Sequence, residues 1–217
     1  MLDLFSDTPP WQEPLAPGAV VLRRFAREHA PGLLQAIADV ARQSPFRQMV
    51  TPGGYTMSVA MTNCGRLGWT TDRHGYLYAP VDPVTHHTWP PMPAVFRELA
   101  LAAAAAGGYP GFSPDACLIN RYQPGAKLSL HQDKDEQDLR APIVSVSLGV
   151  PAIFQFGGLQ RSDPLQRLLL EHGDVVVWGG ESSLFYHGVQ PLKAGHHPET
   201  GDCRYNLTFR QAGRPGD

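Results

Sequence analysis

The second half of the chain repeats one pattern, in which short apolar segments are separated by turn signals. Apolar segments recur at residues 117–119, 143–148, 153–156, 168–170, 175–178 and 205–209, with Gly- or Pro-containing turns such as 123–125 and 157–158 between them. The 22 glycines and 21 prolines of the chain favour the same reading. Many short strands joined by turns at this spacing are typical of a β-sandwich or jelly roll.

The first half of the chain adds a strand and two helices. We expect a strand over residues 19–22, and apolar residues recur at helical spacing over 31–42 and 93–106. Proline suits the first turn of the earlier helix, and Gly107 and Gly108 end the later one. We expect both helices to buttress the outer face of the jelly roll.

Residues 47–91, between the two helices, are rich in Gly, Pro, Thr and aromatic residues, a composition typical of a flexible flap with short hairpins. The chain is long enough for one sizeable core. We therefore expect a single α+β, mainly β domain over 1–217, with an N-terminal arm and helix (1–46), the flap (47–91), a helix and linker (92–114), a jelly-roll core (115–210) and a C-terminal tail (211–217).

Composition limits the classes of function. The formal net charge of −2 offers no global electrostatic reason to bind nucleic acid, so such binding would need a local basic patch. The three cysteines are widely spaced and form no CxxC pair, which disfavours a disulfide framework or a cysteine-based zinc site. The N-terminus lacks a signal-peptide pattern, and the longest apolar run is too short to span a bilayer. We expect a cytoplasmic protein without a membrane role, and a monomer.

A metal-ligand pattern begins at His131 and Asp133. Residues i and i+2 of an extended segment point to the same side, so both side chains can reach one ion. The best third ligand is His187, in a Tyr-His-Gly stretch 187 − 133 = 54 residues further on. Two histidines and a carboxylate form the facial triad of non-haem iron oxygenases, although the same set also serves hydrolytic zinc sites.

The strand at residues 204–210 favours the oxygenase. Its alternation places Arg204, Asn206 and Arg210 on one face. Arginines inside a jelly-roll core are costly unless they meet anions, and guanidinium groups pair well with the two ends of a dicarboxylate. Asn120 and Tyr122, again at i and i+2, could complete such a pocket with an amide and a hydroxyl.

With these motifs in place, the chain resembles the bacterial AlkB nucleic-acid dealkylases across nearly its whole length. HxD…H alone covers a superfamily, but RxNxTxR after it narrows the choice to this group. The resemblance is carried by Asn-Arg-Tyr at 120–122, Leu-Ser-Leu-His-Gln-Asp-Lys-Asp-Glu at 128–136, Arg-Tyr-Asn-Leu-Thr-Phe-Arg at 204–210 and Gln-Met-Val-Thr-Pro-Gly-Gly-Tyr at 48–55.

The resemblance implies a double-stranded β-helix core, a nucleotide-recognition flap, and the use of Fe(II), 2-oxoglutarate and O₂. His131, Asp133 and His187 would bind iron. Arg204 would bind the 2-oxoglutarate carboxylate near the metal and Arg210 the distal one, with hydrogen bonds from Asn120, Tyr122 and Asn206. Substrate contacts would come from Trp69 and His131 around the damaged base, Tyr76 at its phosphate and Asp135 at its exocyclic amine, with Thr51 and Arg161 as further candidates.

The implied reaction is the oxidative removal of methyl groups from 1-methyladenine and 3-methylcytosine in DNA, preferentially single-stranded, and in RNA as a further substrate. Decarboxylation of 2-oxoglutarate would be coupled to methyl hydroxylation and release of formaldehyde. Asp135 suits this substrate because these lesions carry positive charge, which a carboxylate can distinguish from a neutral base.

Three alternatives stay open at this level. The same core could oxidise a protein side chain or a small metabolite, which the low net charge permits. A cupin-like protein could bind metal and ligand without turnover. A zinc hydrolase would need neither O₂ nor 2-oxoglutarate.

Overall fold

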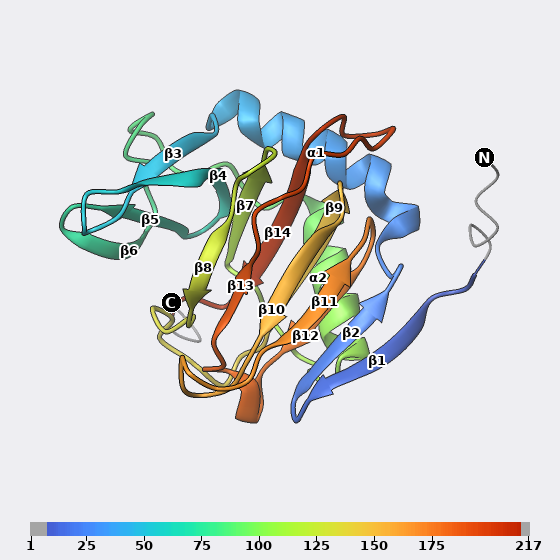
Figure 1. The fold of residues 1–217 in the computed structure, drawn as a ribbon. Helices are drawn as coiled ribbons and strands as arrows, with labels where there is room; N and C mark the ends of the chain where they lie inside the picture. Colours follow the sequence, from blue (N-terminus) through green and yellow to red (C-terminus); the bar gives the residue numbers. More distant parts are fainter. Residues whose placement is uncertain (1–7, 214–217) are drawn as a thin grey trace.

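Two antiparallel β-sheets lie face to face in the computed structural model, which describes residues 8–213, and the two α-helices cover the outer face of the larger sheet (Figure 1). Residues 1–7 of the expected arm and 214–217 of the expected tail therefore lie outside the described residues. No helix within residues 8–213 is long and apolar enough to cross a bilayer.

The larger sheet has eight strands within the described range, in the order β1-β2-β12-β9-β14-β7-β4-β3. Neighbouring strands are antiparallel throughout it. Its strands are β1 (Trp11–Ala16), β2 (Ala19–Arg23), β3 (Arg47–Val50), β4 (Thr56–Gly65), β7 (Ala116–Tyr122), β9 (Ile143–Gly149), β12 (Val175–Trp178) and β14 (Arg204–Arg210).

The smaller sheet has the order β11-β10-β13-β8, and a separate hairpin of β5 and β6 projects beside β3 and β4 (Figure 1). The bounds are β8 (Leu128–His131), β10 (Ala152–Phe156), β11 (Gln166–Leu170) and β13 (His187–Val189), with β5 (Gly68–Asp72) and β6 (Gly75–Ala79) in the hairpin. The helices are α1 (Ala30–Gln43), α2 (Ala94–Ala106) and the short 3-10 turns η1 (Arg27–His29) and η2 (Gly180–Ser182).

One face of the larger sheet forms the core beneath the helices. Ile119 of β7 and Leu207 and Phe209 of β14 are fully buried in the cluster that includes the apolar faces of α1 and α2. The ring of Phe96 from α2 meets Phe209 edge-on, with centroids 5.9 Å apart. This contact fixes α2 on the sheet, since edge-to-face rings contribute beyond their buried area.

The opposite face of the same strands looks into the space between the sheets. Because side chains alternate along a strand, Asn120 and Tyr122 of β7 and Arg204 and Asn206 of β14 all point there. The register pairs Arg204 with Tyr122 and Asn206 with Asn120. A row of polar side chains is thereby buried between two sheets, where it must find partners.

The expected jelly-roll class is confirmed, and both helices begin and end within one residue of their predicted bounds. Two segments differ in detail. Residues 11–16, expected as an arm, form the edge strand β1 because they pair with β2. Within 47–91, β3 and β4 extend the larger sheet, and the hairpin of β5 and β6 stands apart from it.

Candidate metal and dicarboxylate site

His131, Asp133 and His187 come together at the end of the smaller sheet. The register of β8 and β13 places His131 directly opposite His187, with ring centroids 4.4 Å apart. Asp133 follows β8 and reaches both rings, since its Oδ2 is 3.4 Å from His187 Nε2 and its Oδ1 is 3.8 Å from His131 Nε2. One potential ligand atom from each residue lies within 4.8 Å of the other two.

Backbone carbonyls orient both imidazoles toward this point. His131 Nδ1 lies 2.8 Å from the Ser129 carbonyl oxygen, and His187 Nδ1 lies 2.9 Å from the Phe185 carbonyl oxygen. A carbonyl can only accept, so each Nδ1 carries a proton, and Nε2 is the nitrogen that each ring can offer to a metal. Metal-binding histidines are oriented in this way, with the nitrogen that does not bind the metal donating to a neighbouring oxygen. Burial, with His187 nearby, also lowers the pKa of His131 to about 4, which keeps its ring neutral.

Asp133 supplies the negative charge. Burial opposes its ionisation, but Arg210 and the neighbouring imidazoles outweigh that effect and hold the pKa of Asp133 well below its usual range. Its Oδ1 accepts a hydrogen bond from Arg210 Nη2 at 3.0 Å, whereas its Oδ2 is buried without a hydrogen-bond partner among the described residues. Two imidazoles and a carboxylate with an unused oxygen fit a divalent cation.

Arg204 forms a second, anion-seeking part of the site. Its side chain is 1% exposed, lies against the Tyr122 ring at 4.8 Å from the centroid, and donates from Nη2 to Ser147 Oγ at 3.0 Å. Its Nε and Nη1 are buried without hydrogen-bond partners in the described part of the chain. A buried guanidinium whose Nε and Nη1 lack hydrogen-bond partners fits an incoming anion such as a carboxylate.

Amide side chains connect this arginine to the rest of the cavity. Asn120 Nδ2 donates to Asn206 Oδ1 at 3.2 Å, and Asn206 Nδ2 donates to Ser145 Oγ at 2.7 Å. Thr208 Oγ1 donates to the same Asn206 oxygen at 2.8 Å. The network holds these groups rigidly along β14, between the two arginines.

The resemblance implied that Arg204 lies near the metal and Arg210 farther from it, whereas in the structure Arg210 is the one of the two that contacts Asp133. Arg210, predicted to be distal, touches Asp133, whereas Arg204 lies six residues earlier on the strand, about 20 Å away along the backbone. The physical reason is strand direction, because β14 runs toward the loop that carries Asp133.

The predicted substrate residues lie near the mouth of the site. Trp69 of β5 stacks on Tyr76 of β6, with centroids 5.6 Å apart and planes 20° apart, and its Nε1 donates to Asp135 Oδ2 at 3.2 Å. Trp69 thus lies against Tyr76 at the cavity mouth, and the implied placement of a base between Trp69 and His131 stays a prediction. Thr51 Oγ1 accepts from the Tyr55 amide at 3.3 Å.

Arg161 contacts other residues of the protein with part of its guanidinium. It donates from Nη1 to the Leu130 carbonyl at 2.7 Å, and its guanidinium lies over the Tyr186 ring at 5.0 Å. A guanidinium has five N–H donors, so this bond uses only one of them.

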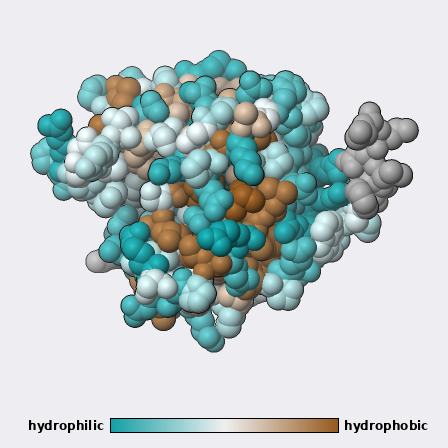
Figure 2. Space-filling view, viewed as in Figure 1, coloured by the Kyte–Doolittle hydropathy of each residue, from teal (hydrophilic) through white to brown (hydrophobic). Residues whose placement is uncertain are grey.

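A single cavity of about 790 Å³ joins all of these parts, within the range usual for small-molecule sites. Figure 2 shows apolar side chains gathered near the middle of the face that carries the smaller sheet, with polar side chains between them. The thirteen predicted site residues all line this cavity: Thr51, Trp69, Tyr76, Asn120, Tyr122, His131, Asp133, Asp135, Arg161, His187, Arg204, Asn206 and Arg210.

Sequence reasoning missed several polar residues that complete the site. Ser145 and Ser147 of β9 accept from Asn206 and Arg204, and Tyr78 and Glu136 extend the contacts of Arg210. The serines could have been found from their alternation in an otherwise apolar strand. Glu136 ends the quoted 128–136 motif, but nothing local shows which way its side chain points.

A second cluster, formed by His172, His197 and Glu199, also has the composition of a metal site. His172 Nδ1 accepts from the Gly149 amide at 3.0 Å, and His197 Nδ1 accepts from the Glu199 amide at 3.2 Å. Each neutral ring therefore carries its proton on Nε2, where a metal would need a lone pair. His172 Nε2 lies 2.9 Å from Glu199 Oε2, so the cluster acts as a tie between loops.

Comparisons with known proteins agree with this geometry. The family model described as "2OG-Fe(II) oxygenase superfamily" matches residues 18–210. The chain is 78% identical to the alpha-ketoglutarate-dependent dioxygenase AlkB of Escherichia coli over 214 residues, which cover 99% of each chain. It is 36% identical to the DNA N(6)-methyladenine demethylase ALKBH1C of Arabidopsis thaliana over 171 residues, which cover 67% of this chain and 38% of that protein.

The solved structure of OsALKBH1 superposes with a TM-score of 0.82 at 30% identity, covering 93% of this chain and 100% of that one. The cofactors of this enzyme class are Fe(II), 2-oxoglutarate and O₂, and the His-Asp-His cluster and the buried arginines supply matching ligands. The chain therefore belongs to the AlkB group of the 2-oxoglutarate- and Fe(II)-dependent oxygenase superfamily.

Proposed function

We propose that this enzyme removes N-alkyl groups oxidatively from damaged bases such as 1-methyladenine and 3-methylcytosine, in DNA and also in RNA. The observation that carries the proposal is the pairing of Asp135 with the aromatic pair Trp69 and Tyr76 at the mouth of the metal cavity. Aromatic faces replace the stacking that an extruded base loses, and a carboxylate favours a base that carries positive charge.

In this proposal His131, Asp133 and His187 hold the iron, Arg204 holds the distal carboxylate of 2-oxoglutarate, and Arg210 orients Asp133. When bound, iron(II), 2-oxoglutarate and O₂ supply the oxidising chemistry that hydroxylates the methyl group. The chain contributes the ligands, the cavity and the orientation of the base. The hydroxymethyl product then releases formaldehyde and the intact base.

Single-stranded nucleic acid is the preferred partner in this proposal, because extrusion of a base costs least where it is unpaired. We further propose that the enzyme acts as a monomer in the cytoplasm. Cys64 and Cys117 lie opposite each other on β4 and β7, both buried as free thiols, which suits a reducing compartment.

An oligonucleotide that carries one 1-methyladenine tests the proposal. With Fe(II), ascorbate and 2-oxoglutarate, its mass should fall by one CH₂, and His131→Ala should abolish the loss. Succinate formation without loss of mass would contradict the base substrate and favour a protein or metabolite. If folded, iron-loaded protein forms neither succinate nor the demethylated oligonucleotide, the result contradicts catalysis altogether.

A further inference from the structure

The hairpin of β5 and β6 is tied to the loop that follows Asp133 by two adjacent hydrogen bonds. Trp69 and Tyr78 face each other in the hairpin register, so their side chains lie on the same side. Trp69 donates to Asp135, and Tyr78 donates from its hydroxyl to Glu136 Oε1 at 2.7 Å. A cross-strand pair thus binds two consecutive carboxylates.

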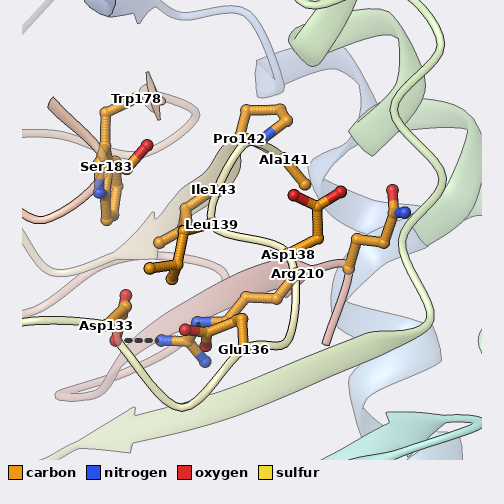
Figure 3. A pocket seen from close by; sticks show the side chains of 11 residues that line it. Asp133, Glu136, Asp138, Leu139, Ala141, Pro142, Ile143, Trp178, Ser183 and Arg210 are labelled. Carbon is orange, nitrogen blue, oxygen red and sulfur yellow. Dashed lines mark hydrogen bonds and ion pairs between the residues drawn. The ribbon is translucent and has the colours of Figure 1, made fainter. Parts of the chain in front are cut away.

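Glu136 turns inward from this tie to a second partner. Its Oε1 lies 3.4 Å from Arg210 Nε, while Arg210 Nη2 lies 3.0 Å from Asp133 Oδ1. Figure 3 shows the Arg210 guanidinium between the two carboxylates. All three side chains are less than 10% exposed, so solvent screens their interactions little.

Sharing one guanidinium between two carboxylates affects what Asp133 can offer to a cation. Glu136 lies on the Nε side of Arg210 and Asp133 Oδ1 lies at its Nη2, while Asp133 Oδ2 has no hydrogen-bond partner among the described residues. Without the charge of Glu136, Asp133 would be the sole counter-ion of Arg210 and a metal would have to compete with that pair. Tyr78 keeps Glu136 in place. Burial raises the pKa of Tyr78 well above its usual value, so its hydroxyl stays a donor.

We propose that Glu136 is a positioning residue that couples the hairpin to the metal site through the path Tyr78–Glu136–Arg210–Asp133. The proposal rests on the metal role of Asp133 and not on the identity of the substrate. Placement of the hairpin and affinity for the metal then depend on each other, as reciprocal coupling requires.

Binding of Mn(II) to the full chain, followed by electron paramagnetic resonance without turnover, tests the coupling. Glu136→Gln keeps an acceptor for Tyr78 but removes the charge. It should weaken Mn(II) binding by about tenfold, as the loss of a residue that orients a metal ligand does. Tyr78→Phe touches no ligand, yet should weaken it by about fivefold, the value of one hydrogen bond. The double variant should lose less Mn(II) affinity than the product of the two single fold-changes.

Asp138→Asn is the matched control, because Asp138 lies on the same loop and pairs with Arg140. It should bind Mn(II) like the wild type. His131→Ala should lose binding; if it binds normally, the metal-site assignment itself is wrong. If His131→Ala loses binding while Tyr78→Phe and Glu136→Gln bind like the control, the coupling alone is wrong.

Amide hydrogen exchange of residues 68–79 gives a readout from the other end of the path. Mn(II) with 2-oxoglutarate should slow exchange there in the wild type, and this protection should be reduced in Tyr78→Phe and in Glu136→Gln. Equal protection in the wild type and both variants would overturn the proposal, whatever their activity.

Discussion

The two arginines of β14 share a strand face but differ in their partners. Arg210 is engaged by Asp133 and Glu136, and these charges raise its pKa despite its burial. Arg204 has no such carboxylate among the described residues, and burial lowers its pKa. Of the two, Arg204 is the one that an incoming dicarboxylate would stabilise most.

Arg204→Lys should therefore raise the dissociation constant for 2-oxoglutarate by about tenfold or more, since lysine loses the fork and one charge-assisted hydrogen bond. Mn(II) affinity should stay within about twofold, because Arg204 touches none of the three metal ligands. Calorimetric titration of the Mn(II)-loaded protein measures the first and titration with Mn(II) the second. Arg210→Lys should weaken the binding of both 2-oxoglutarate and Mn(II). If Arg204→Lys and Arg210→Lys changed the two affinities in the same way, the separate roles of the arginines would be contradicted.

Asp135 is exposed at the cavity mouth, so its charge acts on the substrate more than on the fold. Asp135→Ala should lower the preference for cationic 1-methyladenine over a neutral methylated base by about fivefold, as expected for a partly exposed ion pair. Succinate formed without substrate should change little. Competition between the two oligonucleotides measures the preference, and equal losses in both assays would make Asp135 a structural residue.

At the scale of elements, Asp82 joins the end of α1, the start of β3 and the loop after β6. Its carboxylate accepts from Arg47 through both oxygens at 2.7 Å, from the Ser44 hydroxyl and from the Val84 amide. Burial opposes ionisation, but these donors outweigh it and hold the pKa of Asp82 well below its usual range. The loop that follows the hairpin of β5 and β6 is therefore attached to the end of α1 and the start of β3.

Asp82→Ala should lower the free energy of unfolding at pH 7 by about 3 kcal/mol, because it leaves Arg47 without its buried partner. Because the pKa of Asp82 is lower in the folded state than in the unfolded state, its ionised form stabilises the fold at pH values above the unfolded pKa of about 3.9. That contribution is lost as the pH falls below this value. The difference between wild type and variant should therefore shrink below about pH 4. Urea unfolding of wild type and variant at pH 7 and below about pH 4 measures this difference.

Asp39→Asn is the control for this experiment. Asp39 pairs with Arg42 on the exposed side of α1, where an ion pair contributes less than about 1 kcal/mol. The role of Asp82 would be contradicted if Asp82→Ala lowered the free energy of unfolding no more than Asp39→Asn does, or if its effect did not shrink in acid.

At the scale of the whole molecule, a net charge of −2 leaves affinity for nucleic acid to a few local cations. Lys127 and Lys134 line the cavity together with Arg161, so we expect these cations to meet phosphates beside a bound base. Binding of a single strand should therefore depend only moderately on salt.

Each phosphate contact contributes about −0.7 to the slope of log affinity against log salt for single strands. Lys127→Ala and Lys134→Ala should each flatten that slope by about this amount, as measured by fluorescence anisotropy with the Mn(II)-loaded protein. Lys193→Ala, an exposed loop residue outside the cavity lining, should leave the slope unchanged. Equal slopes for all of these variants would show that neither lysine meets a phosphate.

Local periodicity by itself determined much of this protein. The period-2 alternation of 204–210 predicted which side chains face inward, and the HxD spacing predicted that His131 and Asp133 share a side. Helical periodicity predicted α1 and α2 to within one residue at each end. These features depend on neighbouring residues in the chain, so they can be read from it directly.

Only the tertiary structure decided what depends on how distant strands pair. The register of β13 with β8 brings His187 opposite His131, and the direction of β14 places Arg210, and not Arg204, beside Asp133. Tyr78 meets Glu136 across 58 residues of chain. Pairing and direction are set by burial of the whole core, so no local pattern contains them.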